Sequence, residues 1–105
     1  MNEISPQELV QMRQSGEDFQ LIDIREAYET ESVQIGGTII PMDEVLERSD
    51  ELRNDCKVIV FCRTGKRATA VVEALQRLKG MTNVYSLQGG IFGYIDQVEP
   101  ALPKY

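Results

Sequence analysis

The sequence predicts an α/β fold in three layers, with a central parallel sheet flanked by helices. Segments rich in β-forming residues alternate with segments of helical periodicity, which is typical of parallel strands joined by crossover helices. The unbroken apolar run 58–62 indicates a strand that is buried on both faces. A length of 105 residues suits one hydrophobic core, so we expect a single domain over residues 1–105.

The first half of the chain predicts one well-marked helix and two strands. Ser5 and Glu8 have the spacing of a capping box, Pro6 suits the first helical turn, and Gly16 favours the end of that helix. The segment 19–24 favours a strand. The segments that follow predict, in order, a short helix at 26–32, a short strand at 38–40, one or two helical turns at 43–48 and a polar loop at 49–55.

The second half predicts two strands, each followed by a helix. A strand at 57–61 precedes a helix that Gly80 ends. Its apolar positions recur at helical spacing, at Ala68, Val71, Val72, Leu75 and Leu78, and we interpret the first four as a core stripe. A strand at 83–87, a Gly-Gly turn and a helix at 91–98 complete the pattern. Ligands of parallel sheets bind beyond the carboxyl ends of the strands, and Cys62 lies there.

Charge and hydropathy exclude several classes of function. The formal net charge is −6, from 17 acidic and 11 basic residues, which argues against nucleic acid and anionic membranes as partners. No apolar run approaches the length of a membrane span, and the N-terminal residues lack the basic and apolar regions of a signal peptide. We therefore expect a cytoplasmic monomer that binds neither nucleic acid nor membrane.

The absence of histidine narrows the chemistry further. Neither a Ser-His-Asp triad nor a Cys-His pair can form without it. The two cysteines alone cannot build a structural zinc site, so we expect no metal and no organic cofactor. Any nucleophilic cysteine must therefore be activated by charge and hydrogen bonding alone.

Cys62 stands between the most buried predicted strand and a predicted helix. Backbone N–H groups of the loop and the helix N-terminus converge there, and the helix dipole adds partial positive charge. Arg63, Lys66 and Arg67 add three cations within five residues, and Gly65 lets the loop curl. These features favour a thiolate and an anionic substrate. The alternative is that Cys62 is a small core residue and that the three cations belong to an ordinary solvated helix start. Cations at a helix N-terminus are unfavourable, so their presence there argues for a bound anion instead.

The segment 62–67, Cys-Arg-Thr-Gly-Lys-Arg, resembles the active-site loop of the rhodanese family of sulfurtransferases. Three more segments resemble family signatures in the same order: the Asp-x-Arg strand end at 21–26, the segment 36–41 and the Gly-Gly turn at 87–91. The resemblance implies a rhodanese-like fold and a thiosulfate sulfurtransferase activity. Sulfane sulfur would pass from a small anionic donor to a nucleophilic acceptor through a persulfide on Cys62.

The resemblance also implies roles for individual residues. Cys62 would be the catalytic residue, and Asp23 and Arg25 would support the loop. The residues that would bind substrate are Arg63, Thr64, Gly65, Lys66 and Arg67. The segments 35–37 and 102–105 are similar to rhodanese domains fused to the adenylating enzymes of molybdopterin and thiamine sulfur pathways, which implies a sulfur-carrier protein as acceptor.

The remaining candidate residues are interpreted as structural. Cys56 precedes the strand that Cys62 follows, so roughly 15–20 Å separates them and no disulfide between them is expected. We expect a solvated helix face from the carboxylates of Glu26, Glu29 and Glu31. We expect packing rather than stacking roles for Tyr28, Tyr85 and Tyr94.

Two departures from the family pattern and two alternative functions remain. The segment 32–35 stands where the family often has Gly-His-Ile, and Tyr94 stands where a tryptophan is common, but neither changes the cysteine loop. Related phosphatases carry one more residue between cysteine and arginine, so the six-residue loop disfavours phosphatase or arsenate-reductase chemistry. The other alternative is a non-catalytic module for sulfide sensing or partner binding, which the intact Cys62 disfavours.

Overall fold

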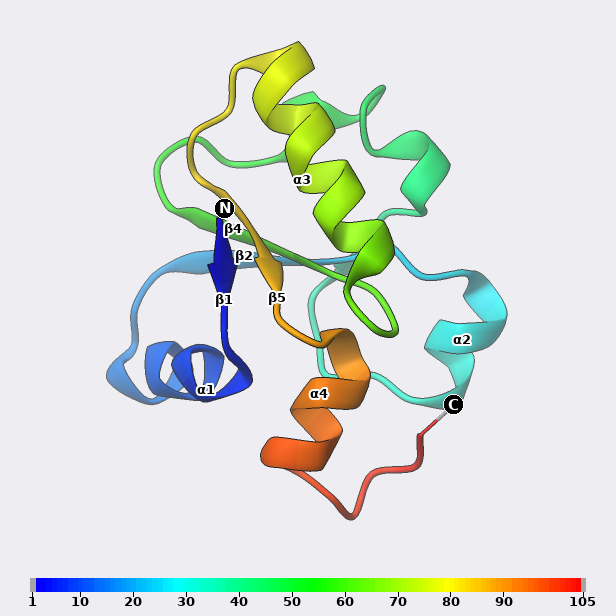
Figure 1. Ribbon diagram of the computed structural model, residues 1–105. Helices are drawn as coiled ribbons and strands as arrows, with labels where there is room; N and C mark the ends of the chain where they lie inside the picture. The colour runs from blue at the N-terminus through cyan, green and yellow to red at the C-terminus, as the bar shows by residue number, and fades with distance from the viewer. Residues whose placement is uncertain (1, 105) are drawn as a thin grey trace.

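The computed structural model describes residues 2–104 as a five-stranded sheet with helices on both faces (Figure 1). Every strand pairing is parallel, and the strand order is β1-β5-β4-β2-β3. The strands are β1 (Glu3–Ile4), β2 (Phe19–Asp23), β3 (Thr38–Ile39), β4 (Lys57–Phe61) and β5 (Val84–Leu87). The predicted α/β fold with a central parallel sheet is confirmed.

Within residues 2–104, three α-helices and two short 3₁₀ segments connect the strands, and a fourth α-helix follows β5. The helices are α1 (Pro6–Ser15), α2 (Ala27–Ser32), α3 (Lys66–Lys79) and α4 (Gly90–Gln97), and the 3₁₀ segments are Met42–Glu44 and Ser49–Glu51. The capping box of α1 forms as predicted, with the Glu8 N–H donating to Ser5 Oγ at 3.1 Å and the Ser5 N–H donating to Glu8 Oε1 at 3.0 Å. The predicted helices correspond to α1, α2, α3 and α4, whereas the helical turns predicted at 43–48 shorten to the 3₁₀ segment Met42–Glu44 and the predicted polar loop contains the 3₁₀ segment Ser49–Glu51.

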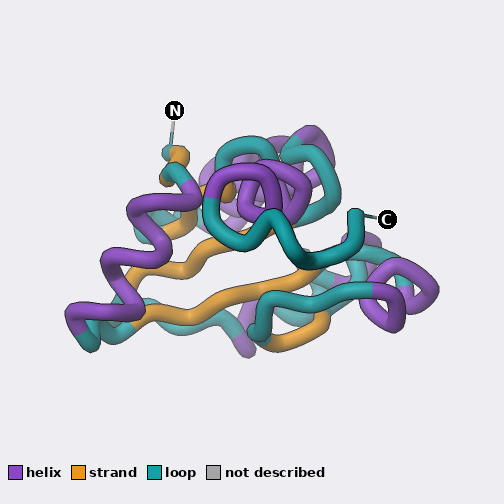
Figure 2. The backbone as a smooth tube through the Cα atoms, turned by 90° about the horizontal axis from the view of Figure 1, so that it is seen from below, coloured by secondary structure: helices purple, strands orange, loops and turns teal. Residues whose placement is uncertain are grey.

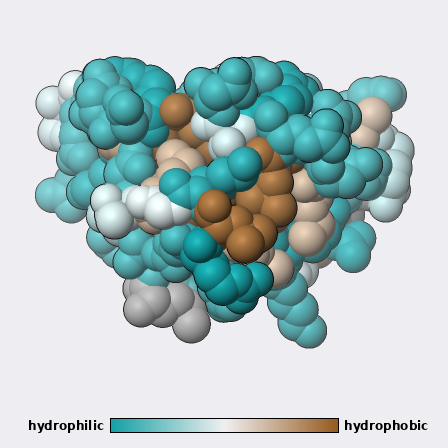
Figure 3. All heavy atoms as spheres, turned by 90° about the horizontal axis from the view of Figure 1, so that it is seen from above, coloured by the Kyte–Doolittle hydropathy of each residue, from teal (hydrophilic) through white to brown (hydrophobic). Residues whose placement is uncertain are grey.

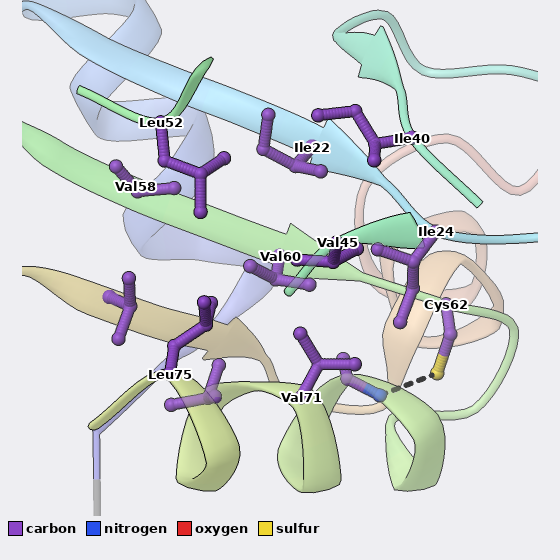
Figure 4. Close-up of a cluster of buried hydrophobic side chains, with 13 residues drawn as sticks. Ile22, Ile24, Ile40, Val45, Leu52, Val58, Val60, Cys62, Val71 and Leu75 are labelled. Carbon is purple, nitrogen blue, oxygen red and sulfur yellow. Dashed lines mark hydrogen bonds between the residues drawn. The ribbon is translucent and has the colours of Figure 1, made fainter. Parts of the chain in front are cut away.

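Two apolar clusters fill the space between the sheet and its helices. The first lies between the sheet, α3 and the segment 40–52, and it includes Cys62 beside Ile24 and Val71 (Figure 4). The second lies between the sheet, α1 and α4, which are seen from below in Figure 2. Burial on both faces explains why β4 is an unbroken apolar run, since Val58 to Phe61 are 0% exposed.

The structure adds one strand to those predicted. In β1, Glu3 pairs with Ser86 and Ile4 with Leu87 of β5. The Gln88 N–H donates to the Ile4 carbonyl at 2.8 Å, just beyond that pairing. Two residues are too few for an alternating pattern to show in a sequence, so only the tertiary structure reveals this strand.

The surface departs from the sequence pattern at two positions. Leu78 continues the helical spacing of α3 but is 60% exposed, and Tyr28, for which a packing role is expected, is 58% exposed. Tyr94, in contrast, is buried against α1. Seen from the α3 side, the surface is largely hydrophilic with an apolar patch near its centre (Figure 3). Within residues 2–104, no helix is both long and apolar enough to cross a membrane.

Two leucines on α3 test the assignment of its buried face. Leu75 is 0% exposed, so Leu75→Ala should lower the free energy of unfolding by about 2–5 kcal/mol through lost burial and a cavity. Leu78→Ala is the matched control, with an expected change below about 0.5 kcal/mol because the side chain is already solvated. Urea unfolding of both variants measures the difference, and equal losses would contradict the packing of α3.

Candidate active site

Cys62 directly follows β4 and faces the first turn of α3. Its side chain is buried, and its Sγ accepts hydrogen bonds from the Gly65 N–H at 3.1 Å and the Ala68 N–H at 3.4 Å. Figure 4 shows the second of these bonds as a dashed line. Gly65 makes the turn possible because its φ of +106° lies in a region that other residues rarely adopt. Two backbone donors therefore meet at the sulfur.

Further backbone donors surround the same turn. Within residues 2–104, the N–H groups of Arg63, Thr64, Lys66 and Arg67 donate to no protein acceptor. Six consecutive N–H groups, from residue 63 to residue 68, are thus directed either to Sγ or to no protein group at all. Unpaired backbone donors favour a bound anion, as expected for a loop that leads into a helix N-terminus.

The three predicted cations of the loop fall into two groups. Arg63 and Lys66 are exposed and form no ion pair with any carboxylate in the described part of the chain, although Arg63 lies over the Phe92 ring. Arg67 instead donates to both carboxylate oxygens of Glu29, at 3.0 and 2.9 Å. The free positive charge at the loop therefore comes from Arg63 and Lys66.

Glu29 corrects the expectation of a solvated helix face on α2. Its side chain is 2% exposed, whereas Glu26 and Glu31 are exposed as expected. Burial by itself raises the pKa of Glu29, but hydrogen bonds from the Arg67 side chain and the Glu26 N–H outweigh it and hold the pKa below its usual range. A glutamate on a short polar helix gives no sign in the sequence that it will be buried, because its partner Arg67 belongs to a distant segment of the chain, α3.

Asp23 and Arg25 form a fully buried ion pair at the ends of the strands. Arg25 donates to both oxygens of Asp23, from Nε at 2.9 Å and from an Nη at 2.8 Å. It also donates to the carbonyls of Glu29 and Val33, at 3.3 and 2.7 Å, and lies over the Phe61 ring. The pair therefore ties α2 to the end of β2 and to Phe61 at the end of β4, next to Cys62, and the supporting role of both residues stays a prediction.

An open groove adjoins the loop on its β1 side. Its volume is about 370 Å³, and its lining consists of Glu3, Thr64, Gly65, Lys66, Thr69 and Gly89. The groove and the Glu29–Arg67 pair flank the loop from different elements, β1 on one side and α2 on the other. A partner molecule can therefore approach the loop from the groove without displacing Glu29.

The comparison with known protein families decides the assignment of the chain. Residues 5–97 match the family model described as a rhodanese-like domain. This chain belongs to the rhodanese-like domain family. The family supports a sulfurtransferase type of activity, and the predicted resemblance is confirmed.

Individual relatives share the rhodanese-like domain at low identity. MoeZ of Mycobacterium tuberculosis, named a probable adenylyltransferase/sulfurtransferase, is 29% identical over 105 residues, which cover 97% of this chain and 26% of MoeZ. YqhL of Bacillus subtilis is 36% identical over 72 residues, 68% of this chain and 56% of YqhL. A rhodanese-related protein from Thermoplasma volcanium superposes with a TM-score of 0.79 at 29% identity, covering 95% of this chain and 96% of that one. This chain thus spans about a quarter of MoeZ and about half of YqhL.

Cys56 lies apart from the loop 62–67 of this rhodanese-like domain. It precedes β4, at the end opposite Cys62, and burial raises the pKa of its thiol, an effect that the nearby Arg53 only partly offsets. Among the described residues no group of three or more histidine, cysteine, aspartate or glutamate side chains could hold a metal ion. Of the two cysteines, only Cys62 accepts hydrogen bonds from the backbone N–H groups of the loop and of α3.

The Glu29–Arg67 pair gives a pH-dependent prediction for stability. Glu29→Gln should lower the free energy of unfolding at pH 7 by about 1–2 kcal/mol, because it removes the charged partner of Arg67. The folded pKa of Glu29 is lowered, so the ion pair contributes fully above the unfolded value and is lost as pH falls through the folded value. The gap between wild type and variant should therefore be full well above pH 4.5, the ordinary pKa of a glutamate, and should close as pH falls below that value.

Urea unfolding at several pH values measures this gap. Glu31→Gln is the matched control, since Glu31 lies on the same helix but is exposed, and it should change stability little at any pH. A gap for Glu29→Gln that stays constant from pH 7 to pH 3 would contradict the ion pair.

Proposed function

We propose that this domain transfers sulfane sulfur through a persulfide on Cys62. The observation that carries the proposal is the convergence of backbone N–H groups on and around Cys62 Sγ, with four more donors left open within the described chain. A persulfide places its outer sulfur one bond beyond Sγ, where an anion needs such donors. The six-residue spacing from Cys62 to Arg67 leaves a small space, which suits a single sulfur atom better than a tetrahedral phosphate.

The proposed reaction has two displacement steps. The Cys62 thiolate attacks the outer sulfur of a thiosulfate-type donor; a new sulfur–sulfur bond forms, the donor's own sulfur–sulfur bond breaks, and sulfite leaves with the electron pair. An acceptor nucleophile then attacks the outer sulfur of the persulfide, and the electron pair returns to Cys62 as the thiolate. Backbone donors stabilise the anion in both steps, so this covalent route needs no histidine.

We infer that the donor is a small anion and that Arg63 and Lys66 attract it. Both side chains are exposed at the loop and lack a carboxylate partner among the described residues, in a protein whose net charge is −6. Arg67 was also predicted to bind substrate, and that role stays a prediction, since its guanidinium is bound to Glu29 here. The positive charge is local, so the site draws anions in while the rest of the surface repels them.

We infer that the physiological acceptor is a sulfur-carrier protein, which reaches the loop with an extended tail. MoeZ is named as both an adenylyltransferase and a sulfurtransferase, and this chain corresponds to only a quarter of it. The groove beside the loop is open, so it suits a thin peptide segment better than an enclosed small molecule. A small thiol is the simpler acceptor, and faster transfer to glutathione than to carrier proteins at equal concentration would favour it.

Two alternative functions are distinguished by simple measurements. A phosphatase or arsenate reductase on this fold would release phosphate or reduce arsenate without loading sulfur on Cys62. A binding module for sulfide sensing would hold sulfur without passing it to any acceptor. Each alternative predicts a different fate for the sulfur atom, which mass spectrometry follows directly.

Sulfur loading tests the role of Cys62. Treatment with thiosulfate should add the mass of one sulfur atom to the wild type and to Cys56→Ser, and it should add nothing to Cys62→Ser. The physical reason is that only Cys62 lies among the backbone donors. Intact-mass spectrometry gives the result, and a loaded Cys62→Ser protein would overturn the assignment.

Two lysines at opposite ends of α3 test the attraction of the donor. Lys66→Ala should raise KM for thiosulfate about three- to tenfold, because it removes one free positive charge beside the loop. Lys79→Ala removes a charge from the far end of the same helix and should leave KM within about twofold of wild type. Steady-state kinetics at low and high salt measure both, and salt should reproduce part of the loss. Equal KM values for wild type and Lys66→Ala would show that Lys66 is an ordinary solvated side chain that does not attract the donor.

A further inference from the structure

The first turn of α4 packs directly on the backbone of the cysteine loop, residues 62–67. The Ile91 N–H donates to the Cys62 carbonyl at 2.8 Å, and the Phe92 N–H donates to the Arg63 carbonyl at 3.0 Å. These are donors that a helix leaves unpaired at its N-terminus. Here they are satisfied by the loop instead of by a capping side chain, which α4 lacks.

These two hydrogen bonds fix the orientation of two peptide groups. In a trans peptide the carbonyl and the following N–H point in opposite directions, and no described peptide bond is cis. Because the Cys62 and Arg63 carbonyls are held toward α4, the N–H groups of Arg63 and Thr64 are turned away from it. They are two of the four loop donors without a protein acceptor in residues 2–104.

Gly90 permits this close approach. A Cβ at residue 90 would lie 2.5 Å from the Arg63 carbonyl oxygen and 2.6 Å from that of Cys62, distances at which the loop or the helix must move. The φ of Gly90 is +63°, so a side chain is also disfavoured by backbone conformation. Gly80, at the end of α3, has nearly the same φ, +66°, yet a Cβ there would meet nothing within 4 Å.

We propose that Gly90 is a positioning residue for the reaction, because it lets the first turn of α4 orient the loop peptides whose N–H groups receive the sulfur anion. Gly90 touches neither Sγ nor the donor; it acts through the Cys62 and Arg63 carbonyls. The expected effect of Gly90 on turnover rests on the proposed function. Its expected effect on the thiolate fraction of Cys62 does not.

The first experiment compares Gly90→Ala with Gly80→Ala, which carries the same backbone strain without the collision. The readout is the iodoacetamide alkylation rate of Cys62 at pH 7 divided by its plateau at high pH, measured in a Cys56→Ser background. This ratio reports the thiolate fraction and cancels changes in access. Gly90→Ala should lower the ratio about five- to tenfold, and Gly80→Ala should leave it within twofold of the parent. Amide resonances of residues 63–68 should move in Gly90→Ala alone.

The second experiment removes one hydrogen bond without the collision, in case Gly90→Ala does not fold. Phe92→Pro deletes the N–H that holds the Arg63 carbonyl, and the first turn of a helix tolerates proline. Phe92→Ala is its control, since it removes the ring but keeps the N–H. The alkylation ratio should fall severalfold in Phe92→Pro and stay within twofold of the parent in Phe92→Ala.

Folded Gly90→Ala and Phe92→Pro proteins with wild-type ratios and wild-type amide resonances would overturn the proposal. The failure of the proposed function has a different signature. A wild type that takes up no sulfur from thiosulfate, while its variants follow the expected alkylation ratios, would refute sulfur transfer and leave the positioning role of Gly90 standing.

Discussion

The structure depends on one constraint, namely that the backbone N–H groups of residues 63–68 are kept out of the ordinary backbone hydrogen-bond pattern. Such donors are costly unless something accepts from them, and Cys62 Sγ accepts from two. The carbonyls of Cys62 and Arg63 accept hydrogen bonds from α4 instead. The strand order makes these contacts possible. It puts the central strand β4 directly before the loop, and it brings α3 and the β5–α4 turn to the same edge of the sheet.

Two neighbouring elements hold the loop in different ways. On one side, α2 is tied to the sheet by Asp23 and Arg25 and binds the Arg67 side chain through Glu29. On the other side, α4 binds the loop backbone. The side-chain contact neutralises one of three cations, and the backbone contact leaves charge unchanged. Position and charge at the site are therefore set by separate contacts, which allows each to be altered alone.

The sequence predicts the parts of this site that arise from local patterns. The apolar run of β4, the helical spacing of α3 and the position of Cys62 between them are readable because each depends on neighbours in the chain. Contacts between distant segments are not readable in this way. The buried side chain of Glu29 is paired with Arg67 of α3, which lies thirty-eight residues further along the chain. The two-residue strand β1 forms only because it pairs with β5. The double glycine at 89–90 is visible in the sequence, but the collision that requires it is not.

Both edges of the sheet are formed by strands of only two residues, β1 and β3. An exposed edge is a template on which another chain can add a strand, and its danger grows with its length. Here each edge strand offers few free ladder positions, and the two edge strands cover only residues 86–87 of β5 and residues 22–23 of β2. A second molecule therefore gains few hydrogen bonds by pairing with β1 or β3, and edge strands as short as these disfavour aggregation by strand addition.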